Sequence, residues 1–378
     1  MMNNVTFEKK RLLKPLPYYL TKPLSRNIRE GFIKYLVNKK CGSFIIDIPD
    51  DLAAVKNILF VLPEDTLEAL HQIVNILSII NHFNKTHNVH TFFLCEKRVA
   101  PYFSNFQGTN SVIEYDTSER YLFSNHFSLL QKRLAKEYID LCLFLERDPD
   151  LSLLYLVGQI QAKIRISFSD VGSFPFFNFQ IKSTDRHTHL TEQNNIMSRI
   201  LGAKLSSDIH WSVSKDTIDE IKVMLKESSI SESDWVGGID AQLLYFKYGP
   251  TWMDNLIENL TAQSNKKWYL YTRDLPEDSF FDWLKSKKMP VFSNLSPPRL
   301  AALLKKTDLI ISGKAETFEL ANLLQTTAIG LFEKNELQKY CKSTPHSIGI
   351  PYTNKPDEQT IKSLIDLMTA LAAQKDTI

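Results

Sequence analysis

Short apolar runs alternate with amphipathic stretches along the first half of the chain. The apolar runs predict strands at 56–63, 89–96, 111–116, 139–146 and 163–169. Apolar residues at helical spacing predict helices at 65–83, about 123–137, 151–160 and about 189–203. Strands that alternate with helices in this way form a parallel sheet with helices on both faces.

A second series of the same kind follows a polar stretch at 216–234, which predicts a polar helix and linker. Strands are expected at 235–242, 268–274 and about 290–293, and helices at 251–263, 279–287, 297–306 and 356–374. Residues 308–332 predict a strand, a tight turn, a helix and another strand. The chain is therefore expected to form two α/β lobes. Ligands of open α/β sheets bind beyond the carboxyl ends of the strands, so we expect the site in a cleft between the lobes.

The composition is that of an ordinary globular protein. The 378 residues are 43% hydrophobic and 23% charged, and the 12 glycines are too few for several glycine-rich phosphate loops. No apolar run approaches the roughly 20 residues of a membrane-spanning helix, and no secretory signal is predicted. Four cysteines lie far apart and indicate reduced core residues of a cytosolic protein: Cys41, Cys95, Cys142 and Cys341.

Charge is distributed unevenly along the chain. Residues 1–40 hold ten Lys or Arg and two Glu, a net charge of +8, whereas the remainder carries −6. Aromatic and aliphatic residues interleave with the basic ones, which suits an anionic membrane surface better than a nucleic acid. The candidate lipid or acceptor contacts are Lys9, Lys10, Arg11 and Lys14. The alternative is an N-terminal arm that packs on the protein with its lysines in water. Peripheral attachment of a cytoplasmic protein to the inner membrane is one outcome.

Five ordered blocks resemble glycosyltransferase family 9, the heptosyltransferases of lipopolysaccharide assembly. They are ILFVLPEDTLEAL (58–70), YIDLCLFLERDPDLSLLYLVGQIQAKIRISF (138–168), KYGP (247–250), SPPRLAALLKKTDLIIS (296–312) and ELANLLQTTAIGLF (319–332). The resemblance implies a GT-B fold, with two Rossmann-like lobes facing a cleft. It also implies transfer of a sugar from a nucleotide-diphosphate donor to a lipid-linked glycan, without a metal or other cofactor.

The resemblance also implies a domain organisation. The charge and polarity of the sequence set off a basic extension at 1–50 and a linker at 216–234, and the resemblance makes 51–215 the acceptor-side domain and 235–355 the nucleotide-sugar-side domain. A final helix within 356–378 is expected to return to the first domain.

Asp65 is the candidate catalytic base. The family begins its first helix with a Gly-Asp pair, whose Asp takes the proton of the acceptor hydroxyl; this chain has Glu64-Asp65. A carboxylate at the end of the first strand suits general-base chemistry. The alternative is that Asp65 only caps the helix, which stabilises by about 1 kcal/mol. Glu64 in place of glycine narrows the turn and adds a second charge.

Lys247 is a candidate donor-phosphate ligand. It matches the lysine of the family's Lys-x-Trp-Pro motif, with Gly249 in place of tryptophan and Pro250 kept. A capping box at 251–254 predicts that a helix begins immediately afterwards. A cation beside a helix N-terminus suits a diphosphate. The alternative is a solvated surface lysine.

The turn at 313–319 has the shape of a nucleotide site with altered chemistry. The family's Asp-Thr-Gly-Pro-x-His run binds the diphosphate there, which makes Gly313, Lys314 and Thr317 the corresponding phosphate candidates. Glu316 and Glu319 replace the glycine and the histidine and already complement the helix dipole. Lys314 is expected either to bind phosphate or to pair with one of these glutamates.

Two further stretches have structural alternatives. The aromatic run at 174–179 suits either an acceptor-facing loop or core packing. Asp185, His187 and His189 suggest a metal site, but no matching ligand cluster accompanies them, so a polar loop is favoured. No P-loop, nucleophile elbow, zinc-protease motif or dinucleotide fingerprint is present.

The leading hypothesis is a divergent heptosyltransferase-like enzyme. The alternative is a non-catalytic pseudoenzyme that kept the fold as a binding or scaffold protein and lost its donor site. This second hypothesis predicts Lys314 paired with Glu316 or Glu319. A nucleotide-sugar epimerase is a weaker third option with the same two-lobe fold.

Overall fold

The computed structural model describes residues 47–375. Excepted are residues 87, 105, 107, 121–123, 148–150, 169–175, 183–189, 206–210, 212, 263–265, 275–278, 342–343 and 354–355. The contacts divide the chain into two units, and the second unit begins in the sequence between residues 205 and 215. Each unit is built around its own sheet.

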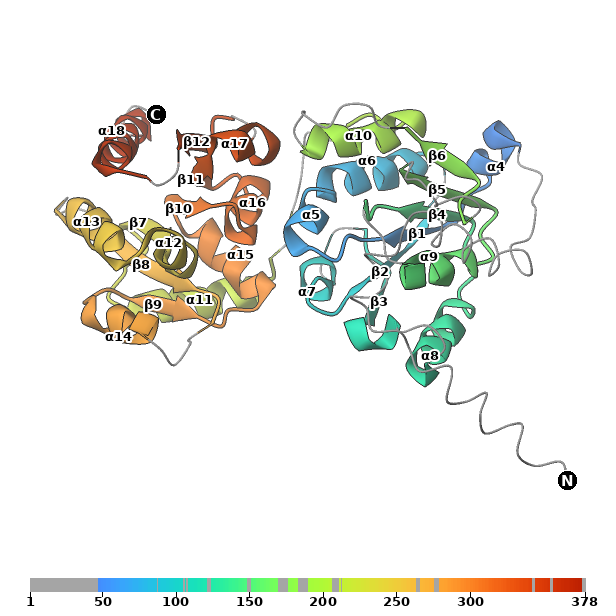
Figure 1. Cartoon of the computed structure of the whole chain (residues 1–378), viewed down its shortest axis with the longest axis horizontal. Helices are drawn as coiled ribbons and strands as arrows, with labels where there is room; N and C mark the ends of the chain where they lie inside the picture. Colours follow the sequence, from blue (N-terminus) through green and yellow to red (C-terminus); the bar gives the residue numbers. More distant parts are fainter. Residues whose placement is uncertain are drawn as a thin grey trace, which may run out of the picture. The chain divides into compact units, whose positions relative to one another are not determined.

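The first unit contains a six-stranded sheet in which every neighbouring pair is parallel (Figure 1). Its order is β3-β2-β1-β4-β5-β6. The strands are β1 (Asn57–Val61), β2 (His90–Glu96), β3 (Ser111–Tyr115), β4 (Leu141–Phe144), β5 (Ile164–Phe168) and β6 (Phe179–Ile181). The central strands β1, β4 and β5 are almost continuously buried, as expected for a parallel sheet covered on both faces.

Helices cover both faces of this sheet (Figure 1). They are α4 (Ile48–Ala53), α5 (Thr66–Leu70), α6 (Ile73–Phe83), α7 (Ala100–Phe103), the 3-10 helix η1 (Thr117–Arg120), α8 (Asn125–Leu134), α9 (Leu151–Gly158) and α10 (Leu190–Ile200). Buried side chains of α8 and α9 form one core with β1 to β4. Phe176 and Phe177 belong to the same core, so core packing accounts for this part of the aromatic run.

The predicted helix at 65–83 is divided into α5 and α6. The break leaves the carbonyl of His71 outside a regular helix, where it accepts a hydrogen bond from Asn194 Nδ2 at 3.3 Å. The buried Asn75 accepts a further bond at its Oδ1 from the backbone N–H of Ser198, at 3.2 Å. These hydrogen bonds connect α10 to α6 and to the break before it. The apolar periodicity of the sequence alone does not predict the break.

The second unit repeats the architecture. Its parallel sheet has the order β12-β11-β10-β7-β8-β9. The strands are β7 (Trp235–Asp240), β8 (Lys266–Thr272), β9 (Val291–Ser293), β10 (Leu309–Gly313), β11 (Thr327–Glu333) and β12 (Ser347–Tyr352). Gly238 leaves room for Tyr269 of the neighbouring strand, because a Cβ there would lie 2.5 Å from the phenol ring. The expected α/β fold with two Rossmann-like lobes is confirmed.

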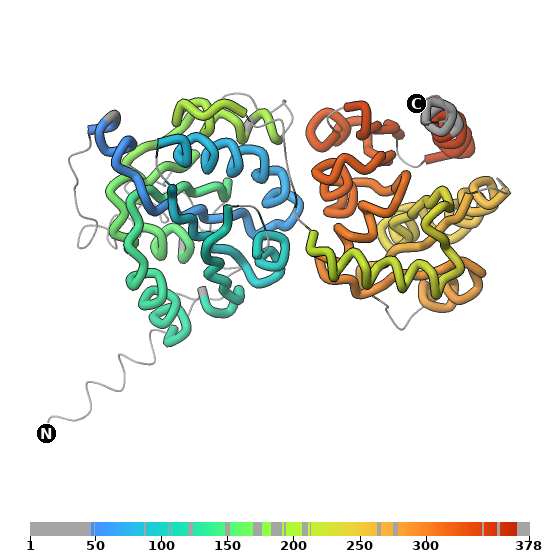
Figure 2. The backbone as a smooth tube through the Cα atoms, turned by 180° about the vertical axis from the view of Figure 1, so that it is seen from behind, coloured from blue at the N-terminus to red at the C-terminus, as the bar shows by residue number. Residues whose placement is uncertain are grey.

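Two groups of helices cover this second sheet. They are α11 (Lys215–Glu227), α12 (Ala241–Tyr248), α13 (Pro250–Thr261), α14 (Ser279–Ser286), α15 (Pro297–Lys305), α16 (Glu316–Leu323), α17 (Lys334–Tyr340) and α18 (Glu358–Lys375). Helix α13 contacts α12 and α18, whereas α15 contacts α11 and α16. Figure 2 shows the tube of α11 running beside α15.

Two parts of the expected domain organisation differ from the structure. The polar helix expected within 216–234 is present as α11, but it buries Ile221 and Leu225 and packs on α15, so it is the first helix of the second unit rather than part of a linker. The final helix was expected to return to the first domain. Ile361, Leu364 and Met368 of α18 instead lie in the core of the second unit, because their apolar stripe packs beside α13 and β12.

Cys95 and Cys142 are free and buried, as predicted, and burial raises the pKa of each thiol to about 12. Cys341 is free and half-buried. Cys41 lies outside the described residues. Among the helices of the described part of the chain, none is both long enough and apolar enough to cross a membrane.

Candidate functional site

Each sheet reverses its strand order at a central pair of strands, β1 and β4 in the first unit and β7 and β10 in the second. Ligands of open parallel sheets bind beyond the carboxyl ends of the strands at this point. Asp65 follows β1, whereas Gly313, Lys314 and Thr317 lie at or just after the end of β10. The candidates predicted from the sequence therefore lie at the carboxyl ends of the central strands, where ligands of such sheets bind.

Asp65 is the N-cap of α5. Its Oδ1 accepts a hydrogen bond from the backbone N–H of Glu68 at 3.0 Å, and the side chain is exposed. This bond satisfies one of the unpaired N–H groups at the start of the helix. The capping role is thus present, and an exposed carboxylate remains at the end of the strand.

Glu64 fastens this edge of the first sheet. Its backbone N–H donates to Glu146 Oε2 at 3.1 Å, and its carbonyl accepts from Arg98 Nε at 3.2 Å and Nη2 at 3.0 Å. Its side-chain Oε1 accepts from the Tyr115 hydroxyl at 3.0 Å. Because these partners follow or end β4, β2 and β3, residue 64 links the carboxyl ends of four strands. The carboxylate of Glu64, which the family's glycine would lack, therefore accepts a hydrogen bond within the protein.

Arg147 follows β4 at the same edge and was missed by sequence reasoning. Its Nη2 donates to Asn194 Oδ1 at 2.8 Å, and its guanidinium lies 4.6 Å from the centre of the Phe168 ring. Burial lowers the pKa of this guanidinium, while the charge of Glu68 opposes the shift. Arg165, by contrast, is buried and donates to the carbonyls of Phe176 and Ala162.

Asp240 is the buried carboxyl at the corresponding edge of the second sheet. Its Oδ2 accepts from the Ser312 hydroxyl at 2.9 Å, and its Oδ1 caps α12 by accepting from the Leu243 N–H at 3.4 Å. Burial raises the pKa of Asp240, and hydrogen bonds from Ser312 and Thr317 oppose that shift. This residue ties β7 to β10 and to the start of α16.

Two of the predicted phosphate ligands have structural partners. Thr317 is buried and contributes a side-chain hydrogen bond to Asp240. Gly313 is buried at the end of β10, where a Cβ would lie 3.0 Å from the Leu331 carbonyl oxygen and 3.2 Å from a Leu243 methyl carbon. Close packing against β11 and α12 therefore accounts for Gly313 without a ligand, and the hydrogen bond to Asp240 accounts for Thr317.

The two predicted phosphate lysines lie together. Lys314 Nζ is 3.2 Å from Glu336 Oε1, and Lys247 Nζ is 3.7 Å from Glu336 Oε2. Lys247 Nζ also lies 3.8 Å from Glu333 Oε1. Both ammonium groups thus converge on one carboxylate of α17, a helix that sequence reasoning did not predict.

Tyrosine rings accompany the two lysines. Lys314 Nζ lies 4.2 Å from the centre of the Tyr340 ring, and Lys247 Nζ lies 5.4 Å from that of Tyr352. Burial opposes the charge on Lys314, but Tyr340 and Glu336 together raise its pKa above the ordinary value. The contact with the Tyr340 ring favours the cationic form of Lys314.

Lys247 was predicted to precede a helix, and α13 does begin at Pro250. Lys247 lies in the last turn of α12, and Gly249, with a φ of 91°, separates this helix from α13. The expected capping box is absent, since Asp254 instead accepts a bond from Trp283 Nε1 at 2.7 Å and pairs with Lys287. Pro250 begins α13, where its missing N–H costs no helical hydrogen bond.

The hypothesis of a non-catalytic protein predicted that Lys314 pairs with Glu316 or Glu319, and this choice of partner is wrong. Glu316 pairs with Arg273, which follows β8, and Lys314 pairs with Glu336. Glu316 extends from the first turn of α16 toward the neighbouring strand end, while the Lys314 side chain contacts α17. The turn therefore separates its two charges instead of pairing them with each other.

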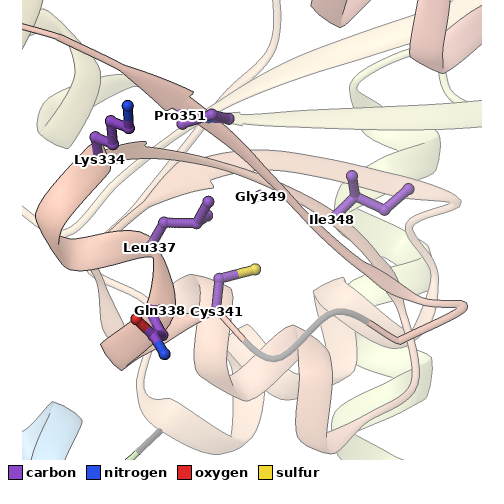
Figure 3. A pocket seen from close by; sticks show the side chains of 7 residues that line it. All are labelled: Lys334, Leu337, Gln338, Cys341, Ile348, Gly349 and Pro351. Carbon is purple, nitrogen blue, oxygen red and sulfur yellow. The ribbon is translucent and has the colours of Figure 1, made fainter. Parts of the chain in front are cut away.

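A shallow apolar hollow of about 510 Å³ lies beside α17 (Figure 3). It is lined by Lys334, Leu337, Gln338, Cys341, Ile348, Gly349 and Pro351. Of the predicted site residues that the structure describes, none lines it. Within the described ranges, no three His, Cys, Asp or Glu side chains gather closely enough to hold a metal ion.

Several predicted contacts lie outside the described residues. These are the candidate lipid-binding residues Lys9, Lys10, Arg11 and Lys14 and the candidate metal ligands Asp185, His187 and His189.

Solved structures of glycosyltransferases share this architecture. The chain is similar to a glycosyl transferase family 9 protein of Veillonella parvula, with a TM-score of 0.69 and 12% identity over 82% of this chain and 90% of that one. It is also similar to heptosyltransferase WaaC of E. coli with ADP, with a TM-score of 0.65 and 12% identity over 83% and 99%. E. coli ADP-heptose lps heptosyltransferase II gives a TM-score of 0.63 and 12% identity over 85% and 99%. No family model and no curated protein matches the chain.

The two parallel six-stranded sheets define a GT-B-like fold. The chain shares this fold with the solved family 9 glycosyltransferase and the two heptosyltransferases, which confirms the fold expected from the resemblance of the sequence blocks.

Proposed function

We propose that the chain is a glycosyltransferase that uses a nucleotide-diphosphate sugar. The observation that carries this proposal is the convergence of Lys247 and Lys314 on the two oxygens of Glu336, at 3.7 and 3.2 Å. Two ammonium groups spaced to contact one anion suit the oxygens of a diphosphate. The fold shared with ADP-bound WaaC supports the same interpretation.

In this proposal the second unit binds the donor without a metal ion. Lys247 and Lys314 neutralise charge that develops on the departing diphosphate, which is how fixed cations lower the barrier to group transfer. Gly313 and Thr317 shape the strand end that carries Lys314. The donor sugar is heptose-like in this proposal, by analogy with the heptosyltransferases of similar fold.

Asp65 is the proposed general base in the first unit. Its carboxylate accepts the proton of the acceptor hydroxyl as the new glycosidic bond forms and the bond to the diphosphate breaks. The proposed acceptor is a lipid-linked glycan. The basic residues Lys9, Lys10, Arg11 and Lys14 would hold the protein at an anionic membrane surface.

In the first test the full chain is titrated with ADP, UDP, GDP, CMP and ADP-heptose. Binding is measured by calorimetry and by the shift in thermal unfolding. A ligand at 100 times its Kd stabilises a protein by about 2.7 kcal/mol. We expect stabilisation by one nucleoside diphosphate and its loss in Lys247→Ala and Lys314→Ala. Lys222→Ala is the matched control, because Lys222 pairs with Glu232 on α11 and the following turn.

A non-catalytic binding protein is the second candidate. It is favoured by the carboxylates that already compensate the cations: Glu333 and Glu336 at Lys247, and Glu316 at Arg273. No stabilisation by any of these nucleotides at millimolar concentration, with all proteins folded, would reject the enzyme and favour this candidate.

A further inference from the structure

The Glu336 carboxylate lies where an anionic ligand of both lysines would place its oxygens. Each of its oxygens faces a different ammonium group, Oε1 that of Lys314 and Oε2 that of Lys247. The Glu336 side chain is only 21% exposed. Partial shielding from water strengthens such contacts beyond those of fully exposed ion pairs. A ligand phosphate that contacts both lysines has to compete with this carboxylate.

We propose that Glu336 is an internal counter-ion that holds the phosphate position in the unliganded protein and is displaced when the donor diphosphate binds. This inference rests on the proposed function, since it assumes that Lys247 and Lys314 receive the donor. It deepens that function by making Glu336 a determinant of donor affinity. A diphosphate supplies more charge and more acceptor oxygens than one carboxylate, so it can replace Glu336 at both lysines.

The surroundings allow Glu336 to leave without loss of the lysine positions. Tyr340 contacts Lys314, and Tyr352 contacts Lys247, through their ring faces. These contacts do not involve the carboxylate. Lysines that stay oriented after the exchange bind the incoming anion at a lower entropic cost.

The backbone of α17 is anchored independently of Glu336. On the side of the helix that faces the hollow, Leu337 and Cys341 approach Gly349 of β12 so closely that a Cβ there would lie 2.2 Å from a Leu337 methyl carbon and 2.8 Å from Cys341 Sγ (Figure 3). The side chains of Leu337 and Cys341 thus pack the helix against β12. With the backbone held in this way, the proposed exchange moves the Glu336 side chain and leaves the helix in place.

The test compares diphosphate binding in the full chain and in Glu336→Gln by calorimetry, with ADP, UDP, GDP and inorganic pyrophosphate as probes. We expect binding at least about tenfold tighter in the variant, because the competing charge is removed while the shape is kept. Glu333→Gln should give a smaller gain, since Glu333 contacts only Lys247 among the two lysines. Glu232→Gln is the matched control, as it removes a glutamate from a lysine pair on another part of the unit and should change nothing.

The outcomes separate the inference from the function on which it rests. Equal or weaker diphosphate binding in a folded Glu336→Gln variant, when the parent chain binds, overturns the inference and leaves the proposed function standing. Absence of binding to the parent, to Glu336→Gln and to Glu333→Gln overturns both. If Glu336→Gln and Glu232→Gln increase diphosphate affinity equally, the effect is due to the overall charge of the protein, and the inference is also rejected.

Discussion

The edges at which the two sheets reverse their strand order have the same topology and opposite chemistry. In the first unit the turn after β1 presents carboxylates, and Glu64 is held by Tyr115, Arg98 and Glu146. In the second unit the turn after β10 presents Lys314, which meets Lys247 at Glu336. One edge therefore suits proton acceptance and the other suits an anion.

The difference also lies in how each edge uses its buried polar groups. Asp240 is buried and ties β7, β10 and α16 together, whereas Asp65 is exposed and its side chain accepts a local hydrogen bond from the Glu68 N–H. A buried carboxyl that connects several elements, such as Asp240, has a structural role. An exposed carboxyl at a strand end, such as Asp65, is accessible to the hydroxyl of an acceptor substrate. The comparison thus separates the carboxyls that maintain the fold from the one assigned to the chemistry.

The largest expected effect distinguishes the two roles of Asp65. Asparagine caps helices about as well as aspartate, so Asp65→Asn should keep the melting temperature but remove the base. We expect transfer to fall by about 10²–10⁴-fold. The assay follows release of the nucleoside diphosphate from the nucleotide sugar whose nucleotide binds in the titration. Asp65→Ala should in addition lose about 1 kcal/mol of stability. Transfer within threefold of the parent in Asp65→Asn would leave Asp65 as a cap only.

Asp240 should show the opposite behaviour, a large effect on stability. Asp240→Ala leaves the buried hydroxyls of Ser312 and Thr317 without their acceptor, which we expect to cost about 1–3 kcal/mol for each unsatisfied group in the free energy of unfolding. Denaturant unfolding measures this loss. A loss no larger than that of an exposed substitution would mean that the second edge does not depend on its buried carboxyl.

The pH dependence of Asp240 has a definite sign. Burial raises its pKa above 3.8, so folding favours the protonated form. Its stabilising contribution is fully present below pH 3.8 and is lost as the pH rises through the higher folded value. Asp240→Asn removes this dependence, so its unfolding free energy should improve relative to the parent as the pH rises from about 4 to 8. A constant difference over that range would contradict the assignment.

A smaller effect is expected at the first edge from Tyr115→Phe, which removes the hydroxyl that donates to Glu64 at 3.0 Å. The loss should be about 0.5–1.5 kcal/mol in the free energy of unfolding, the usual worth of one hydrogen bond, or somewhat more because the acceptor is a carboxylate. Tyr138→Phe is the control, since that side chain is 77% exposed. Equal effects of the two changes would mean that Glu64 is not held by Tyr115.

Much of the fold could be predicted because buried strands are local signals. The runs at 56–63 and 139–146 contain β1 and β4, and the expected pattern within 308–332 matches β10, α16 and β11. Helix α12 was missed because AQLLYFKY has no clear apolar stripe, so the strand prediction ran on past Asp240. Helix α17 and strand β12 were missed at the sheet edge, where burial is mixed and the pattern is weak.

The candidate site could be predicted only in part. Lys247 and Lys314 were found because a family pattern marked their positions. Glu336 was not found, because it lies 22 residues beyond Lys314 in a helix without a strong pattern, and only the tertiary fold brings the two together. Asp240 was missed for a similar reason, since a single Asp at the end of a strand with two glycines shows neither its burial nor its partners.

The smallest expected effect comes from Glu316→Gln and decides where on the second edge an anion binds. Glu316 pairs with Arg273, whose side chain is 60% exposed, so the loss of this pair should change the unfolding free energy by about 0–1 kcal/mol. Diphosphate affinity, measured by calorimetry beside Glu336→Gln, should change much less than in that variant, because Glu316 contacts Arg273 rather than the lysines. A gain as large as that of Glu336→Gln would place the phosphate at the N-terminus of α16, where Glu316 competes for the helix dipole. In that case the turn after β10 would bind phosphate at a helix N-terminus, as phosphate-binding turns generally do, although Lys314 and Glu316 are both engaged in ion pairs.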